Sequence, residues 1–258
     1  SAACELGRFA PSEVIRGGGA SHDPVLEDAL FHRLSCCVDE EQPGQFSPAD
    51  SQEVLESHFG ESLSELGLTG LPEAVLAAGT LLRTLLTLQK NDLTHIRQLQ
   101  YYTSGKFMEL DMDARRNLEL TETLRSKEKK GTLLWVLDKT HTAMGGRLLR
   151  SWIEKPLLDG GEIYRRQSAV EELVSATAVR GELEEALRDV SDLERVMTRI
   201  VTGTVNCRDL LGLAKGLRAL PQVKRQLQEL EPPLLVSLNG EIDPLEDCAE
   251  RIEATIVD

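Results

Sequence analysis

Apolar residues along most of this chain recur at the spacing of an α-helix. Residues 71–90 carry Leu, Ala and Val at three- and four-residue intervals, and Pro72 stands where a helix would begin, so they predict one long helix. Beyond Asp111 the same period runs through nearly every segment, including 193–201 and 208–220, without an internal repeat or sustained heptads. The pattern therefore predicts an all-α domain over the C-terminal two-thirds of the chain.

The first 70 residues are less regular than the rest. A helix candidate at 23–34 precedes a possible strand at 34–38, and Gly- and Pro-rich loops lie on both sides of this pair. A second helix is predicted to begin at Ser47, whose hydroxyl would cap it, and to end before Gly60. This part of the chain is predicted to mix α and β structure.

Short polar residues mark further helix starts. The stretch 132–139 is typical of a short helix, and Thr140 or Thr142 would cap the helix that follows it. Three more starts show capping-box spacing, in which Glu follows a polar cap: Asp159 with Glu162, Ser191 with Glu194, and Asp243-Pro244 with Glu246.

A central helix is predicted over residues 111–124. On a helical wheel, Asn117 falls inside the apolar arc that contains Leu120 and Leu124, so we expect it to be buried. A buried amide needs hydrogen-bond partners or costs about 1–3 kcal/mol, and backbone groups of a neighbouring element would supply them. A rotated or frayed helix that leaves Asn117 half exposed is the alternative.

Composition places the chain among globular proteins. It has 258 residues, enough to bury a real core, and its 41% hydrophobic and 28% charged content is ordinary for that class. No apolar run approaches the ~20 residues that cross a bilayer. The five cysteines are odd in number and scattered, which indicates a reducing compartment and argues against a disulfide framework.

Charge is unevenly distributed along the chain. Residues 1–105 carry 6 Lys and Arg against 15 Asp and Glu, a net −9. Residues 106–166 carry 13 against 10, a net +3, and residues 167–258 carry 10 against 18, a net −8, which together give the total of −14. Phosphate contacts need a basic surface, so stand-alone nucleic-acid binding is not expected.

Candidate chemistry is sparse. The sequence contains no G-x-x-x-x-G-K-[ST] phosphate loop, no C-x-x-C or H-E-x-x-H metal pattern, and no convincing catalytic constellation. Trp135 and Trp152 lie among leucines and are predicted to anchor the core. The densest basic run, 125–131, could contact phosphates or an acidic partner, or could be a solvated helix end. Its cations, which form a possible contact patch, are Arg125, Lys127, Lys129 and Lys130.

An ordered series of motifs gives the chain a family likeness. The motifs, in chain order, are Leu-Asp at 110–111, RRNLEL at 115–120, TLL-x-x-LD-x-T at 132–140, G-x-RLL-x-x-W at 145–152, Pro-Leu at 156–157 and R-x-x-x-V-x-x-L at 166–173. In this order and spacing, residues 107–174 resemble the core domain of the bacterial MutS family of DNA mismatch-recognition ATPases. Residues 5–15 resemble the end of the connector domain that precedes the core in that family.

This resemblance implies a mainly α protein: a partial α/β connector domain at 1–71, a linking helix at 72–95, and a helical core (lever) domain at 96–258, truncated before the family's clamp. The chain would be an internal piece of a mismatch-repair ATPase that couples DNA-binding and ATPase domains. No catalysis, cofactor or metal is expected in the piece itself, since ATP and Mg would belong to a domain outside it. Mismatched duplex DNA, MutL and a second subunit would be partners of the whole cytoplasmic, nucleoid-associated protein, with weak or no DNA binding by this piece and no membrane contact.

Some features depart from the family pattern or leave alternatives open. Ala114 stands where the family usually has Thr. Phe59-Gly60-Glu61 has the letters of the family's mismatch-probing F-x-E motif, but that motif belongs to a different, N-terminal domain of the family. The opening on Ser1, without Met, suggests a trimmed chain. A self-contained helical adaptor that holds a protein partner is the alternative; an undetected hydrolase is a third possibility with no constellation behind it.

Two glycines in the first turns of the predicted 143–154 helix need a reason, because each costs about 1 kcal/mol relative to Ala. We expect Gly145 and Gly146 to let that helix approach another backbone, with the Asn117 helix as its neighbour, in a joint of the core. Seven residues are our candidates for structural coupling: Arg115, Arg116, Asn117, Gly145, Gly146, Arg147 and Trp152.

Overall fold

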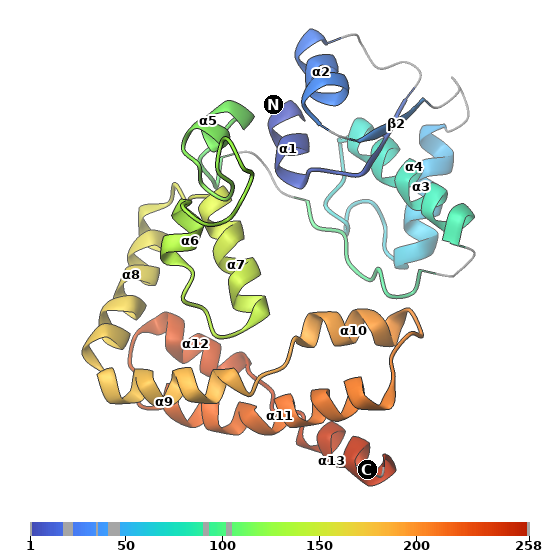
Figure 1. Ribbon diagram of the computed structural model, residues 1–258. Coiled ribbons are helices and arrows are strands. Elements are labelled where there is room, and N and C mark those ends of the chain that lie inside the picture. The colour runs from blue at the N-terminus through green and yellow to red at the C-terminus, as the bar shows by residue number, and fades with distance from the viewer. Residues whose placement is uncertain are drawn as a thin grey trace. The chain divides into compact units, whose positions relative to one another are not determined.

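The chain folds into two compact units, residues 1–104 and 105–258 (Figure 1). The structure is a computed structural model that describes residues 2–17, 23–34, 36–40, 47–89, 93–101 and 105–256. It is mainly helical with one small sheet, which confirms the predicted fold class. No helix in these ranges combines the length and the apolar character needed to cross a membrane.

The first unit contains a two-stranded parallel sheet. Strand β1 (Glu13–Arg16) pairs with β2 (Cys37–Glu40) in a register that sets Glu13 opposite Cys37. Parallel strands need a crossover connection, and the intervening chain supplies helical turns for it. The predicted helix at 23–34 is confirmed, and the predicted strand is shifted to 37–40. The helices of this unit are α1 (Ala2–Phe9), α2 (Pro24–Asp28), the π-helical turn η1 (Ala29–Arg33), α3 (Pro48–Phe59) and α4 (Pro72–Gln89).

Helix α3 has the ends that its sequence predicts. Ser47 Oγ accepts a hydrogen bond from the Asp50 backbone N at 3.1 Å, and an Asp50 carboxylate oxygen accepts one from the Ser47 backbone N at 3.4 Å. Gly60 ends the helix in the left-handed conformation, with φ of 69°. The reciprocal cap and the C-terminal glycine fix where α3 lies in the chain.

Helices α3 and α4 form the core of the first unit around Leu55, Val75 and Leu82. They cross so closely that a Cβ on Gly79 would lie 2.5 Å from Ser51 Cβ and 2.6 Å from Ser51 Cα. Only glycine allows this approach. The structure thus places α4 inside the first unit; its predicted role as a linking helix over 72–95 stays a prediction.

Helices make up most of the second unit in the part that the structure describes. One isolated antiparallel bridge joins Phe107 to Leu157. Its helices are α5 (Met112–Asn117), α6 (Leu133–Leu137), α7 (Ala143–Glu154), α8 (Gly160–Ser175), α9 (Thr177–Arg188), α10 (Leu193–Val201), α11 (Cys207–Leu227), α12 (Pro233–Glu241) and α13 (Glu246–Thr255).

Helix α11 is the central element of the second unit. One side of its C-terminal half packs with α8, α9 and α12 around Val223 and Leu227, and its middle packs on α13 through Ala214 and Ala249 (Figure 1). Burying these apolar side chains stabilises the unit by about 25 cal/mol per Å² removed from water.

The predicted central helix over 111–124 is wrong beyond residue 117. Helix α5 ends at Asn117, and Glu119 adopts a left-handed conformation with φ of 45°. The residues after Glu119 pair with α6 instead of continuing the helix: the Leu134 backbone N donates to the Leu120 carbonyl at 2.9 Å. Asn117 is exposed, so the expectation of a buried amide is also wrong.

Two of the predicted helix caps are displaced. Asp192 caps α10 by accepting a hydrogen bond from the Arg195 backbone N, whereas the Ser191 hydroxyl is buried against α11 without a hydrogen-bond partner. Helix α13 begins after Leu245, which is in the left-handed region, and Asp243 accepts from the Leu245 backbone N instead of capping the helix. The predicted caps at Thr142 and Asp159 are confirmed.

Candidate functional site

The glycine pair of α7 faces the segment that leads into its own helix. Thr142 Oγ1 caps α7 by accepting a hydrogen bond from the Gly145 backbone N at 3.0 Å. A Cβ on Gly145 would lie 3.5 Å from Thr140 Cβ, and one on Gly146 would lie 3.3 Å from Thr140 Oγ1. The expected contact with the Asn117 helix is therefore wrong: the glycines make room for the 138–142 segment.

Asp138 joins that segment to the basic loop. One of its carboxylate oxygens accepts from the Thr140 hydroxyl at 2.7 Å, and the other forms an ion pair with Lys129. Lys129 first and the Thr140 hydroxyl second lower the pKa of the Asp138 carboxyl to about 2. His141 Nε2 lies 3.6 Å from a carboxylate oxygen of Glu184, so Asp138 and His141 have different partners.

Arg147 connects α7 to the start of α10. Its Nη1 and Nη2 donate to the two carboxylate oxygens of Asp192 at 2.9 and 2.6 Å, and its Nε donates to Glu194 at 2.8 Å. This guanidinium holds the pKa of the Asp192 carboxyl below its usual range. Since Asp192 also caps α10, the planar guanidinium of Arg147, called the Arg147 fork below, fixes the start of α10 relative to α7.

The other predicted coupling residues occupy separate places. Arg115 Nε donates to the Leu110 carbonyl at 3.2 Å and its Nη2 to the Glu154 carbonyl at 3.4 Å, so it ties α5 to the end of α7. Arg116 is exposed. Trp152 is 39% exposed and stacks with Arg166, whose guanidinium carbon lies 3.6 Å from the ring centroid.

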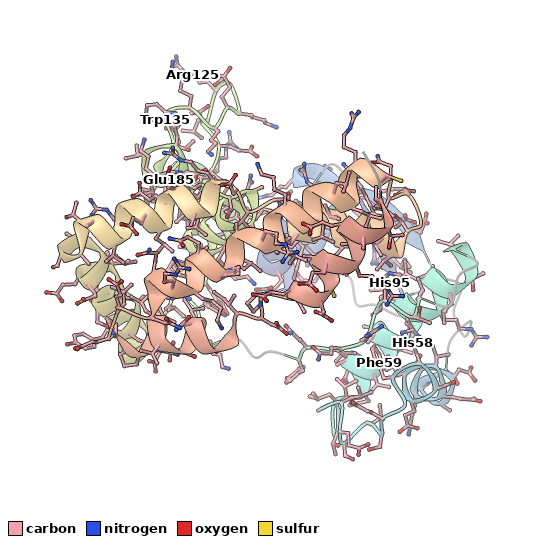
Figure 2. The ribbon with its side chains drawn as sticks, turned by 90° about the horizontal axis from the view of Figure 1, so that it is seen from below. His58, Phe59, His95, Arg125, Trp135 and Glu185 are labelled. Carbon is pink, nitrogen blue, oxygen red and sulfur yellow. The ribbon has the colours of Figure 1, made fainter. Side chains whose placement is uncertain are left out.

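The predicted basic patch lies on a loop, not at a helix end. Arg125, Lys127 and Lys130 are exposed, while Lys129 pairs with Asp138. Trp135 is 48% exposed, which makes its predicted role as a core anchor wrong, and Trp152 is likewise not buried. Figure 2 shows Arg125 and Trp135 at the same end of the second unit. Other exposed apolar side chains on this loop and α6 are Leu118, Leu124, Leu133, Val136 and Leu137.

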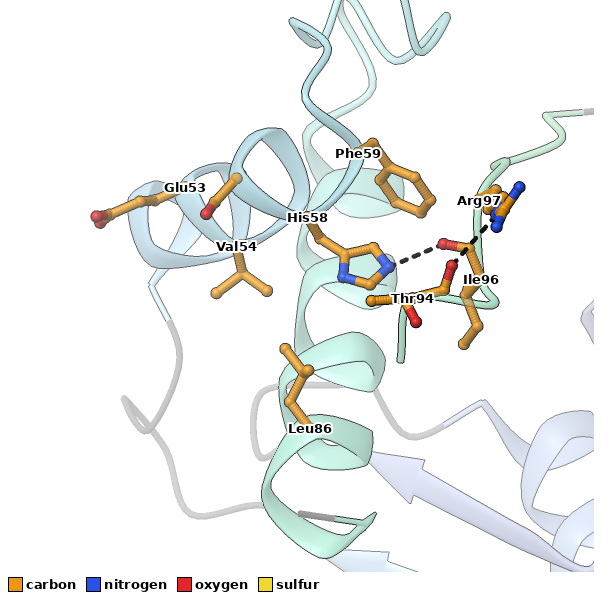
Figure 3. A pocket seen from close by; sticks show the side chains of 9 residues that line it. Glu53, Val54, His58, Phe59, Leu86, Thr94, Ile96 and Arg97 are labelled. Atoms are coloured by element: carbon orange, nitrogen blue, oxygen red, sulfur yellow. Dashed lines mark hydrogen bonds between the residues drawn. The ribbon is translucent and has the colours of Figure 1, made fainter. Parts of the chain in front are cut away.

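A cleft in the first unit was not predicted from the sequence. It has a volume of about 710 Å³ and lies between the C-terminal half of α3, the last turn of α4 and the segment 94–97 (Figure 3). His58 Nε2 lies 2.9 Å from the Ile96 carbonyl oxygen, and Arg97 Nε donates to the Thr94 carbonyl at 3.4 Å. Its lining residues are Glu53, Val54, Ser57, His58, Phe59, Leu86, Thr94, Ile96 and Arg97.

A second, apolar hollow adjoins this cleft. Its volume is about 270 Å³, and it shares Phe59 and Ile96 with the cleft as a common wall. Its other lining residues are Leu55, Ala78, Leu81, Leu82, Leu85, Gln98, Leu99 and Gln100. Sequence reasoning missed both hollows because they form between α3, α4 and an irregular segment that no periodicity identifies; the His58-Phe59 pair at the end of α3 was the one local signal.

Metal binding finds no support in the described parts of the chain. They contain no group of three or more His, Cys, Asp or Glu side chains that could hold an ion. The polar clusters of the second unit are ion pairs and caps that join one helix to the next, and the first unit offers a cleft.

Comparison with known proteins identifies both units. The family model of MutS domain II matches residues 2–97, and that of MutS domain III matches residues 113–258. The chain is 41% identical over 254 residues to the DNA mismatch repair protein MutS of Ruminiclostridium cellulolyticum, covering 98% of this chain and 29% of that protein. For the protein of the same name in Symbiobacterium thermophilum the identity is 41% over 255 residues, with coverage of 98% and 29%. For that of Listeria innocua it is 38% over 238 residues, with coverage of 92% and 26%.

Proposed function

The chain belongs to the MutS family of DNA mismatch repair proteins, and we propose that it is the connecting section of a mismatch-recognition ATPase. In this role it transmits conformational change between DNA-binding and ATPase parts of a longer polypeptide. The observation that carries the proposal is the succession of domains II and III along one chain that spans 29% of the length of the relatives it matches. A self-contained adaptor is not favoured, since family membership extends over nearly the whole sequence.

The chemistry of the whole protein would reside outside this section. The residues present do not fit an ATP–Mg site: the sequence has no phosphate-binding G-x-x-x-x-G-K-[ST] loop, and the described residues hold no acidic or His/Cys cluster for a metal. The section by itself would neither hydrolyse ATP nor prefer mismatched DNA. Its net charge of −14 also opposes contact with a phosphate backbone.

The partners of the section follow from the same proposal. Mismatched duplex DNA, MutL and a second subunit would engage the complete protein in the cytoplasm, at the nucleoid. The exposed cations Arg125, Lys127 and Lys130, beside exposed apolar side chains, would serve contacts within that assembly.

Coupling needs elements that can hold two packed arrangements. The Arg147 fork supports such a role, because it alone joins α7 to both Asp192 and Glu194 across more than 40 residues of sequence. Ion pairs of this kind exchange partners at little cost when half exposed, and the Arg147 side chain is 42% exposed. Arg115, at the other end of α7, would fix that helix to α5.

The test uses the complete protein that contains this chain. Arg147→Met is expected to leave nucleotide-free binding to mismatched DNA within about twofold, and to slow ATP-triggered release from that DNA at least fivefold. Arg150→Met is the matched control, because Arg150 lies on the same helix and pairs only within it, with Glu154 at 3.1 Å. If the two variants release DNA at the same rate, the coupling role of Arg147 is refuted.

A further inference from the structure

An irregular backbone segment, residues 97–100, borders both hollows of the first unit. After Ile96, whose carbonyl oxygen meets His58, residues 97–100 have no backbone hydrogen bond to any described part of the chain. Their side chains alternate between exposed and partly buried at Gln98, Leu99 and Gln100, as in an edge strand. Backbone N–H and C=O groups that have no partner among the described residues can pair with an extended peptide that adds beside them.

The hollows beside this segment suit two apolar side chains. Phe59 and Ile96 separate the larger cleft from the smaller hollow, whose lining is almost wholly apolar. Leu81, on the rim of the smaller hollow, is 53% exposed although it lies in the middle of α4. Apolar side chains from an added peptide would cover it and gain about 25 cal/mol for each Å² buried.

The charges of the cleft are separated and uncompensated. Glu53 and Arg97 lie at opposite ends of it, with His58 between them (Figure 3). Neither Glu53 nor Arg97 forms an ion pair with a described residue. A ligand that complements this cleft therefore carries a cation at one end and a carboxylate at the other.

We propose that this groove, formed by the cleft, the hollow and residues 97–100, binds an extended peptide segment of a partner protein. The peptide pairs its backbone with residues 97–100 and places two apolar side chains on either side of the Phe59–Ile96 wall. A basic residue of the peptide meets Glu53, and an acidic residue meets Arg97. Main-chain pairing supplies affinity, and the hollows and charges supply specificity. This docking function goes beyond the coupling role proposed above.

Selection from a library of random linear 12-residue peptides displayed on phage, against the intact chain, tests the proposal. We expect enriched sequences to share two apolar residues between a basic and an acidic residue. A fluorescein-labelled version of the most enriched peptide is then titrated by anisotropy. Arg97→Glu and Glu53→Lys are each expected to weaken its binding at least tenfold, and a peptide with its two charges exchanged is expected to regain affinity for the double variant.

Two measurements separate docking from a loss of folding. Glu61→Lys is the matched control, since Glu61 is exposed, follows α3 directly and lies outside the groove, so it should leave the affinity within twofold of wild type. Bound peptide is also expected to slow hydrogen exchange of the Gln98–Gln100 amides at least tenfold. No enrichment, binding that is insensitive to Arg97→Glu, or unchanged exchange at these amides would overturn the proposal.

Discussion

Replacing Gly216 by alanine is expected to leave the second unit less stable than the same replacement at Gly212, one turn earlier in α11. The two glycines share a helix, so both replacements gain the roughly 1 kcal/mol by which alanine exceeds glycine in a helix interior. They differ in what the new methyl group meets. A Cβ on Gly212 has nothing within 4 Å, whereas one on Gly216 would lie 2.6 Å from Ser191 Oγ and 3.0 Å from the Ser191 backbone N.

The size of the difference follows from how little Ser191 can move. Its neighbour Val190 is buried in the core of the unit, and its other neighbour Asp192 is held by the Arg147 fork. Carbon atoms pack at about 3.5–4.0 Å, so α11 and this connection would have to separate by several tenths of an ångström. Overpacking of this kind costs about 1–3 kcal/mol. Because the propensity gain cancels between the variants, the same 1–3 kcal/mol is the expected gap, or roughly 2–12 °C in melting temperature.

Thermal unfolding followed by tryptophan fluorescence measures the difference in stability of the second unit between the two variants. Both tryptophans of the chain, Trp135 and Trp152, lie in the second unit, so their signal reports its unfolding and not that of residues 1–104. Adding Ser191→Ala to Gly216→Ala is expected to recover part of the loss, because it removes the closest atom and that hydroxyl has no hydrogen-bond partner to lose. A Gly216→Ala melting temperature equal to or above that of Gly212→Ala would refute the reasoning.

Two further predictions concern the start of α7. Gly146→Leu is expected to lower the melting temperature of the second unit by several degrees, because its Cβ would crowd Thr140 Oγ1 at 3.3 Å; Gly181→Leu, in open space on α9, is the control, and equal shifts would contradict the close contact. The pKa of Asp138, lowered from 3.8 to about 2, means that its ion pair stabilises the fold fully above the unfolded value and is lost as pH falls from about 4 to about 2. Asp138→Asn should therefore remove part of the acid sensitivity of unfolding, which urea melts between pH 2 and pH 6 would measure; unchanged pH dependence would show that Lys129 does not stabilise this carboxylate.

Local patterns were sufficient to predict most of the helices. Helix α3 was predicted from Ser47 and Gly60, and α4 from Pro72 and its apolar spacing, because caps and periodicity act within a few residues. Helix α1 and strand β1 were not predicted, because each is short. Strand β1 also pairs with a strand more than 20 residues further along the chain.

The central helix failed for a related reason. Residues 111–124 have helical periodicity, but Glu119 takes a left-handed conformation and its carbonyl accepts from the Leu133 backbone N at 3.2 Å. The competing contact with α6 overrides the local preference. The helical wheel that predicted a buried Asn117 assumed a continuous helix over 111–124. Because the helix ends at Asn117, the burial prediction was wrong as well.

In the candidate site too, local sequence patterns identified residues but not their distant partners. Family motifs pointed to Arg147, but its partners Asp192 and Glu194 lie 45 and 47 residues away and no spacing rule links them. The glycines show that a close contact between helices cannot be predicted from the sequence of one helix. The pair at 145 and 146 drew attention because it interrupts a helical pattern, yet the tightest backbone approaches are at Gly79 and Gly216, which sit unremarked inside long helices. A sequence shows what glycine costs its own helix, whereas the benefit depends on which backbone lies opposite. The matched substitutions in α11 separate the two, because Gly212 carries the cost alone and Gly216 carries the cost together with the contact.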